Sequence, residues 1–164
     1  MTQGNTEVIT AQSRAEIDAW IVKYPPERKA SAVMAALRIV QEQNGGWLTN
    51  ELMDAVADYL DMPPVAVYEV ATFYSMYEHD PIGRHKISVC TNISCMLRGA
   101  EEVVAHLEKR LGIKAGETTT DGKFTLKTVE CLGACVGAPM LQLGKKYYEL
   151  LTPEKLDELL DGLE

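Results

Sequence analysis

Apolar positions in the first half of the chain recur every three or four residues, in four segments between residues 13 and 80. This spacing is typical of helices that bury one face. The segments are separated by Pro25-Pro26, by Asn44-Gly45-Gly46 and by Pro63-Pro64, and Thr49 is placed to cap the third. We expect a four-helix domain over residues 13–80, preceded by a flexible N-terminus at residues 1–12. The inward positions are Ile17, Trp20, Ile21 and Tyr24; Ala30, Val33, Met34, Leu37 and Val40; Leu52, Val56 and Leu60; and most of residues 65–77.

The pattern changes after the Pro/Gly turn at residues 79–84. Residues 85–91 alternate between apolar and polar, which predicts a strand, and residues 98–111 return to helical spacing. A second strand follows the Asp121-Gly122 turn, a hairpin is expected around residues 144–146, and Thr152-Pro153 is placed to cap a closing helix. The order strand, helix, strand, hairpin, helix predicts an α/β domain over residues 81–164, so the whole chain falls in the mixed α+β class.

The fourth predicted helix, from residue 63 to residue 77, is apolar around most of its circumference. Such a helix needs burial on several sides. One interpretation is a central core helix. The other is that Tyr68, Tyr74 and Tyr77 extend a surface that docks on a partner or on the second domain.

The four cysteines of the chain form two close pairs, Cys90 with Cys95 and Cys131 with Cys135, spaced C-x4-C and C-x3-C. Each pair is expected at the end of a predicted strand. Four thiols in this arrangement are compatible with two disulfides, a structural zinc ion or an iron–sulfur cluster. Disulfides are disfavoured because residues 1–13 have neither the basic start nor the apolar core of a secretory signal. Zinc sites accept such spacings, so a structural zinc ion remains an alternative.

Small residues around the second pair favour a cluster over zinc. Gly133, Ala134, Gly137 and Ala138 let the main chain approach bridging sulfides and donate N–H groups to sulfur. The alternative is that these glycines only form a tight turn. On the first interpretation, Gly133 and Gly137 both direct backbone N–H groups toward the cluster.

Charge and motifs exclude several other classes. Residues 1–80 carry 12 acidic and 5 basic side chains and residues 81–164 carry 12 and 11, so no basic surface for nucleic acid is expected. The apolar runs are too short for a membrane span. Neither G-x-G-x-x-G nor a P-loop is present. The three histidines, His79, His85 and His106, stand apart from the cysteines, which argues against a Rieske-type site.

Three stretches carry a resemblance to a known family: EVATFYSMY at residues 69–77, HKISVCTNISCMLRGAEE at 85–102 and VECLGACVGAPM at 129–140. They resemble the small 2Fe-2S subunits of bacterial NADH:quinone oxidoreductase, respiratory complex I, and the resemblance extends from about residue 17 nearly to the end. It implies a helical bundle followed by a thioredoxin-like 2Fe-2S ferredoxin domain. It also implies that Cys90, Cys95, Cys131 and Cys135 are the cofactor-binding and metal-ligating residues of one 2Fe-2S cluster, and that the chain has no catalytic residues of its own.

The same resemblance implies an electron-transfer subunit of an enzyme. The cluster exchanges an electron with FMN on an adjacent larger subunit, which also binds NADH, and other peripheral-arm subunits complete the complex. We therefore expect neither nucleic-acid binding nor membrane insertion, and a cytoplasmic location peripheral to the inner membrane. Small subunits of NAD-reducing hydrogenases and NAD-dependent formate dehydrogenases share these cysteines and are the closest alternatives. A free-standing ferredoxin and a zinc-stapled helical regulator are the alternatives from other classes.

Overall fold

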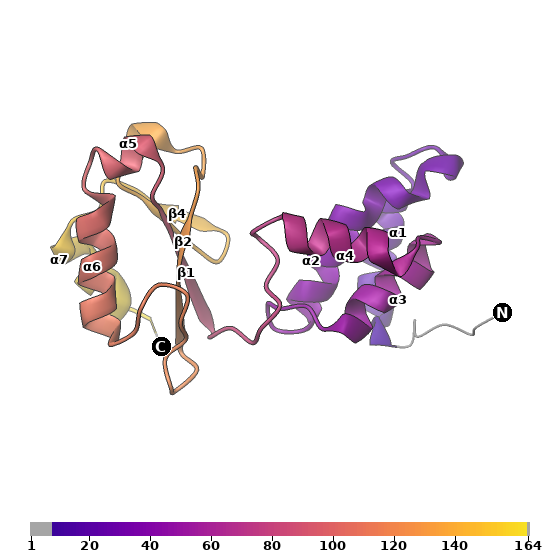
Figure 1. Ribbon diagram of the computed structural model, residues 1–164, viewed down its shortest axis with the longest axis horizontal. Coiled ribbons are helices and arrows are strands. Elements are labelled where there is room, and N and C mark those ends of the chain that lie inside the picture. Colours follow the sequence, from indigo (N-terminus) through magenta and orange to yellow (C-terminus); the bar gives the residue numbers. More distant parts are fainter. Residues whose placement is uncertain (1–7, 164) are drawn as a thin grey trace. The chain divides into compact units, whose positions relative to one another are not determined.

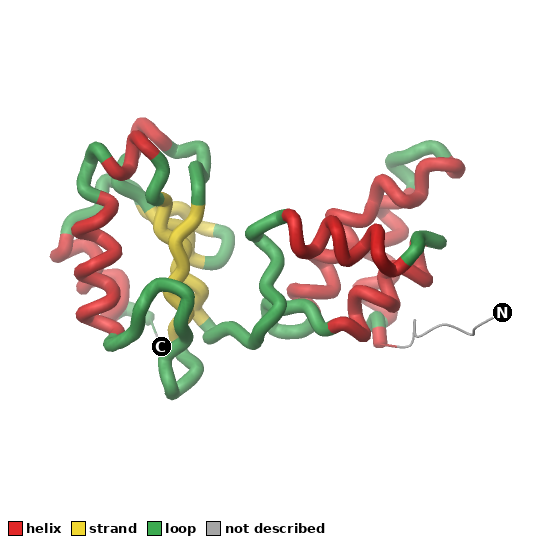
Figure 2. The backbone as a smooth tube through the Cα atoms, viewed as in Figure 1, coloured by secondary structure: helices red, strands yellow, loops and turns green. Residues whose placement is uncertain are grey.

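The computed structural model describes residues 8–163 and divides the chain into two units, Met1–Pro81 and Ile82–Glu164. All the strands lie in the second unit (Figure 2). Residues 1–7 of the predicted flexible N-terminus lie outside the described part. Within the described part Ile9 is fully buried in the core of the first unit, so packed structure begins before residue 13. The predicted domain limits stay predictions.

The first unit is helical (Figure 1). Threonine side chains cap two of its helices, because Thr10 accepts a hydrogen bond from the Ser13 amide and Thr49 accepts one from the Leu52 amide. The elements are α1 (Ala11–Ile21), the 3-10 helix η2 (Pro26–Ala32), α2 (Val33–Gln43), α3 (Asn50–Leu60) and α4 (Pro64–Phe73).

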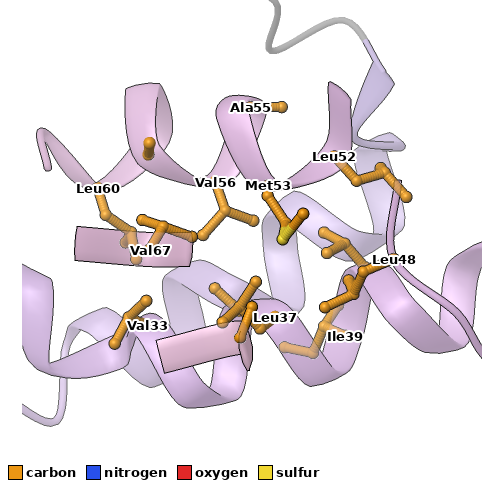
Figure 3. Packing of buried hydrophobic residues seen from close by; sticks show 14 of the residues in the cluster. Val33, Leu37, Ile39, Leu48, Leu52, Met53, Ala55, Val56, Leu60 and Val67 are labelled. Atoms are coloured by element: carbon orange, nitrogen blue, oxygen red, sulfur yellow. The ribbon is translucent and has the colours of Figure 1, made fainter. Parts of the chain in front are cut away.

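The core of this unit uses most of the inward positions predicted for the first three segments. The prediction was wrong for several others, because these side chains are exposed: Ala30, Met34, Val65, Phe73, Tyr74 and Met76. Figure 3 shows Leu37 of α2, Val56 of α3 and Val67 of α4 directed toward one another, and all three are fully buried. Burial of such side chains from water contributes about 1.5–3 kcal/mol each. Packing between helices therefore stabilises segments that are too short to be stable alone.

Two helices differ from the sequence prediction. The helix expected from residue 27 onward begins as η2, in which Arg28 leaves the helical region at φ −118° and ψ 25°, and the regular helix α2 begins only at Val33. The fourth helix ends at Phe73 instead of residue 77, since Tyr74 is extended. The chain then turns inward, and the buried hydroxyl of Tyr77 donates to the Met34 carbonyl at 2.8 Å. Tyr77 is therefore a core residue, and the prediction that it extends a docking surface was wrong.

The second unit contains one mixed four-stranded sheet, as expected for its fold. Its strands are β1 (His85–Cys90), β2 (Phe124–Val129), β3 (Leu141–Leu143) and β4 (Lys146–Tyr148), in the order β2-β1-β3-β4. Strands β1 and β2 are parallel, and the other neighbours are antiparallel. The parallel pair requires a crossover connection, which the helix after β1 supplies.

Two long helices, α6 (Ala100–Leu111) and α7 (Pro153–Asp161), lie side by side against the sheet (Figure 1). Leu107 of α6 and Leu156 of α7 are fully buried in one cluster with Ile87 of β1 and Leu126 of β2. The sequence predicted a helix from residue 98. In the structure α6 begins after Gly99, whose φ of 90° breaks the helical path.

Two short elements were not predicted: the helix α5 (Ile93–Met96) and the 3-10 turn η3 (Cys135–Gly137). Both contain cysteines. Within residues 8–163 no helix combines the length and the apolar character that crossing a membrane requires.

Candidate metal centre

The parallel register of β1 and β2 brings the two cysteine pairs to one edge of the sheet. Cys90, the last residue of β1, stands opposite Val129, the last residue of β2, so Cys131 follows only two residues later. Cys95 lies in α5 and Cys135 opens η3, and Figure 1 shows these two short elements next to each other beyond the strand ends. The fold therefore gathers all four predicted site residues.

The four cysteines are free thiols, and their burial is uneven. Cys90 and Cys95 are 2% and 1% exposed and pack in a small cluster with Ala100, Ala138 and Met140. Cys131 and Cys135 are exposed, with their Sγ atoms 3.5 Å apart. One pair is thus enclosed by apolar groups while the other faces outward.

Electrostatic coupling joins the two pairs. Burial, together with the neighbouring Cys90 and Cys135 thiols, raises the pKa of the Cys95 thiol to about 11. The Cys131 thiol raises the pKa of Cys135, which the Ser94 hydroxyl partly opposes. A thiolate is the form that binds metals, so these thiols need a nearby cation to lose their protons.

A backbone donor lies within the second cysteine loop. The Gly133 amide contacts the Cys131 sulfur at 3.4 Å, and Gly133 has a φ of 84°, which side chains rarely permit. The predicted contact of the Gly133 amide with sulfur is therefore present, and its role toward a cluster stays a prediction. The same prediction was wrong for Gly137, because its amide donates to the Ala134 carbonyl at 3.0 Å.

Side chains outside the cysteines tie the loops together. Asn92 donates from Nδ2 to Glu130 at 2.7 Å and accepts from the Ile93 amide at 2.9 Å, which caps α5 and joins both loops. Tyr147 of β4 donates to the Leu132 carbonyl at 2.8 Å. Sequence reasoning missed these contacts, although an Asn just before a short helix is a recognisable cap signal.

The histidines are engaged away from the cysteines: His79 with the Ala71 carbonyl, His85 with the Phe124 ring and His106 with Asp157. Across the part of the chain that the structure describes, no group of three or more His, Cys, Asp or Glu side chains is arranged to hold a single metal ion. A 2Fe-2S cluster makes a different demand, since it distributes four thiolates over two irons.

The residues present fit such a cluster by their donor chemistry. Four soft thiol ligands converge from two loops, and the Gly133 amide is in contact with one sulfur. Cysteine thiolates select iron–sulfur clusters, and hydrogen bonds to sulfur help to set their potentials.

Comparison with known proteins gives the same picture. The family model described as "Thioredoxin-like [2Fe-2S] ferredoxin" matches residues 17–164. The chain is 49% identical over 143 residues to an NADH-quinone oxidoreductase subunit of Rickettsia bellii, with 87% of this chain and 86% of that protein covered. It is 43% identical over 154 residues to the mitochondrial NADH dehydrogenase [ubiquinone] flavoprotein 2 of Dictyostelium discoideum, with 94% of this chain and 62% of that protein covered.

Among solved structures, an NAD+-reducing [NiFe]-hydrogenase in the air-oxidized state is similar with a TM-score of 0.65. The identity is 20%, and the match covers 76% of this chain and 22% of that chain. This likeness supports the shared fold alone.

Proposed function

Because the chain belongs to the thioredoxin-like [2Fe-2S] ferredoxin family, we propose that it is the electron-transfer subunit of an NADH:quinone oxidoreductase and that Cys90, Cys95, Cys131 and Cys135 hold its one 2Fe-2S cluster. The observation that carries the ligand assignment is the convergence of all four thiols at the shared end of β1 and β2. The subunit role follows from relatives that share about half of their residues with this chain along most of its length.

When bound, the cluster supplies one-electron redox chemistry. The chain's own residues hold it and control its surroundings. Cys90 and Cys95, with Ala100, Ala138 and Met140 beside them, exclude water from the inner side. Cys131 and Cys135 are exposed, so a partner can approach the site from the outer side. The proposed contribution of this chain to the enzyme is therefore electron transfer.

The proposed partner is the larger subunit that binds FMN and NADH. Exposed apolar side chains stand on the same short elements as the cysteines: Ile93 on α5, Leu97 at its end and Val136, which is 96% exposed, on η3. Apolar groups left exposed around a redox site favour a protein partner over open solvent. The remaining peripheral-arm subunits would hold the chain at the cytoplasmic side of the inner membrane.

The experiment is anaerobic purification followed by iron, sulfide and zinc analysis. We expect a brown protein with about two irons and two acid-labile sulfides per chain. Cys131→Ala removes one of four ligands and is expected to abolish the cluster or leave a labile one. Val136→Ala changes an exposed side chain in the same loop and is the matched control, expected to keep the cluster. Equimolar zinc without sulfide, or an unchanged spectrum in Cys131→Ala, contradicts the assignment.

A further inference from the structure

The segment that runs from Tyr147 of β4 to Leu151 is held against the second cysteine loop. Tyr147 donates to the Leu132 carbonyl at 2.8 Å, the Leu150 amide donates to the Gly137 carbonyl at 2.7 Å, and the Leu151 amide donates to Pro139 at 3.1 Å. These three hydrogen bonds span both ends of the loop that contains Cys131 and Cys135. Residues 147–151 therefore have a fixed position relative to the cysteines.

The backbone of this segment is unusual at Leu150. Its φ of 51° lies in the left-handed region, which is unfavourable for a bulky side chain. The Leu150 carbonyl accepts a hydrogen bond from Lys155 Nζ at 2.9 Å, so both peptide groups of Leu150 are tied down. This turn is held in place where Glu149 meets the cysteine loop.

The Glu149 side chain occupies the space that a side chain on Gly137 would need. A Cβ built on Gly137 would collide with the carboxylate of Glu149 and would lie 2.6 Å from its Cγ. Gly137 stands two residues after Cys135 in the same 3-10 turn and does not have a positive φ. With glycine at this position, the Glu149 carboxylate can lie directly beside the loop, and a side chain here would displace it.

We propose that the negative charge of the Glu149 carboxylate lowers the reduction potential of the group held by the four cysteines. The proposal rests on the proposed function. An electron that arrives at the site adds one negative charge, and a carboxylate beside Gly137, two residues from Cys135, disfavours that state. Because Glu149 is exposed, salt screens its influence, and the effect is largest at low ionic strength.

The test uses the full chain with a cluster assembled anaerobically from ferrous iron and sulfide. Glu149→Gln keeps the shape of the side chain and removes the charge. We expect the equilibrium constant for reduction to rise about threefold to tenfold, where tenfold equals about 59 mV for one electron. Glu149→Asp keeps the charge and is expected to stay close to wild type. Redox titration followed by visible and electron paramagnetic resonance spectra gives the potentials, and the shift should shrink in high salt.

Three further variants separate this effect from a loss of packing and from a change in net charge. Gly137→Ala places a methyl group where the carboxylate lies, so it should raise the potential in the same direction as Glu149→Gln. The double variant should add little, because both changes remove the same interaction. Glu158→Gln removes a charge at an exposed position of α7 and is the matched control, expected to leave the potential unchanged.

The outcomes distinguish the two proposals. If Glu149→Gln retains full iron and sulfide with an unchanged or lowered potential, this inference is overturned and the proposed function stands. An equal shift in Glu158→Gln also overturns it, because the effect would then be one of net charge. If the wild-type chain takes up no cluster, the proposed function fails and this inference fails with it.

Discussion

The side chain of Tyr77 links the segment after α4 to the first turn of α2. Its hydroxyl loses water on folding and gains the Met34 carbonyl as its partner. We expect Tyr77→Phe to lower the free energy of unfolding by about 1 kcal/mol, the usual net value of such a hydrogen bond. Urea denaturation measures this, and a stability equal to wild type would contradict it.

The same side chain gives a pH dependence with a defined sign. Burial raises the pKa of Tyr77 to about 12, above the value of about 10 expected in the unfolded chain. The folded state binds the Tyr77 proton more tightly than the unfolded chain does. The resulting contribution to the free energy of unfolding is complete below pH of about 10 and is lost as the pH rises through the folded pKa. Tyr77→Phe should lack this part of the loss of stability at alkaline pH. Comparison of the unfolding curves of wild type and variant across this pH range measures it.

At the scale of single residues, the cysteine site could be predicted from the sequence, because the spacing of the cysteines and the small residues around them are local features. It also identified Gly133, whose role depends only on its own φ and on Cys131 two residues away. Glu149 and Tyr147 were not found. Their contacts depend on how the segment after β4 crosses the loop, and nothing local in the sequence encodes that crossing.

Helices α6 and α7 are joined at their outer edges by charged side chains. His106 contacts Asp157 at 2.9 Å, and Arg110 contacts Asp161 at 2.7 Å and Asp157 at 3.4 Å. The hydrogen bond from His106 lowers the pKa of Asp157. A lowered pKa stabilises the fold above the unfolded value of about 3.9, and this contribution is lost as the pH falls through the folded value.

We therefore expect Asp157→Asn to show a weaker loss of stability below pH of about 4 than the wild-type chain. Thermal unfolding followed by circular dichroism between neutral and acidic pH measures the slope. Glu158→Gln, the next residue on α7, removes a charge without this partner and serves as the control. Equal slopes for Asp157→Asn and wild type would show that the pair does not contribute.

Element boundaries followed the sequence where caps and breakers were explicit, as at Thr49 and Thr152, whose side chains accept the expected hydrogen bonds. They departed from it where tertiary contacts decide. Tyr74 leaves the helix although its neighbours are apolar at helical spacing, since the chain must turn for Tyr77 to enter the core. Helix α5 was too short to produce a periodic signal.

At the scale of the whole molecule, exposed apolar side chains gather at the end of α4 in the helical unit. Tyr74 is 39% exposed and stacks edge to face with the exposed ring of Phe73, whereas Tyr68 is half-buried and bonded to Asp54. Only part of the surface expected from the sequence is therefore available. A pair of exposed aromatic rings is typical of a protein interface.

We expect Tyr74→Asp to weaken assembly with the proposed flavin-binding partner while the variant stays folded and brown. The reason is that a charge must then be buried without a partner when the complex forms. Val22→Asp is the matched control. Val22 is also an exposed apolar residue, at 79%, but it lies at the end of α1 and not on α4. Co-purification with the larger subunit measures the difference. Normal assembly of Tyr74→Asp would place the interface elsewhere.

The shared end of β1 and β2 also determines where the chain tolerates changes in length. The connection between α6 and β2 closes a loop whose entropy changes slowly with length, so added residues there leave the distance from Cys90 to Cys131 set by the strands. One residue inserted within Phe124–Val129 would instead displace the second cysteine loop by about 3.3 Å and turn the following side chains to the opposite face. Insertions are thus compatible with the site in one stretch and excluded from the next, although the two are adjacent in the sequence.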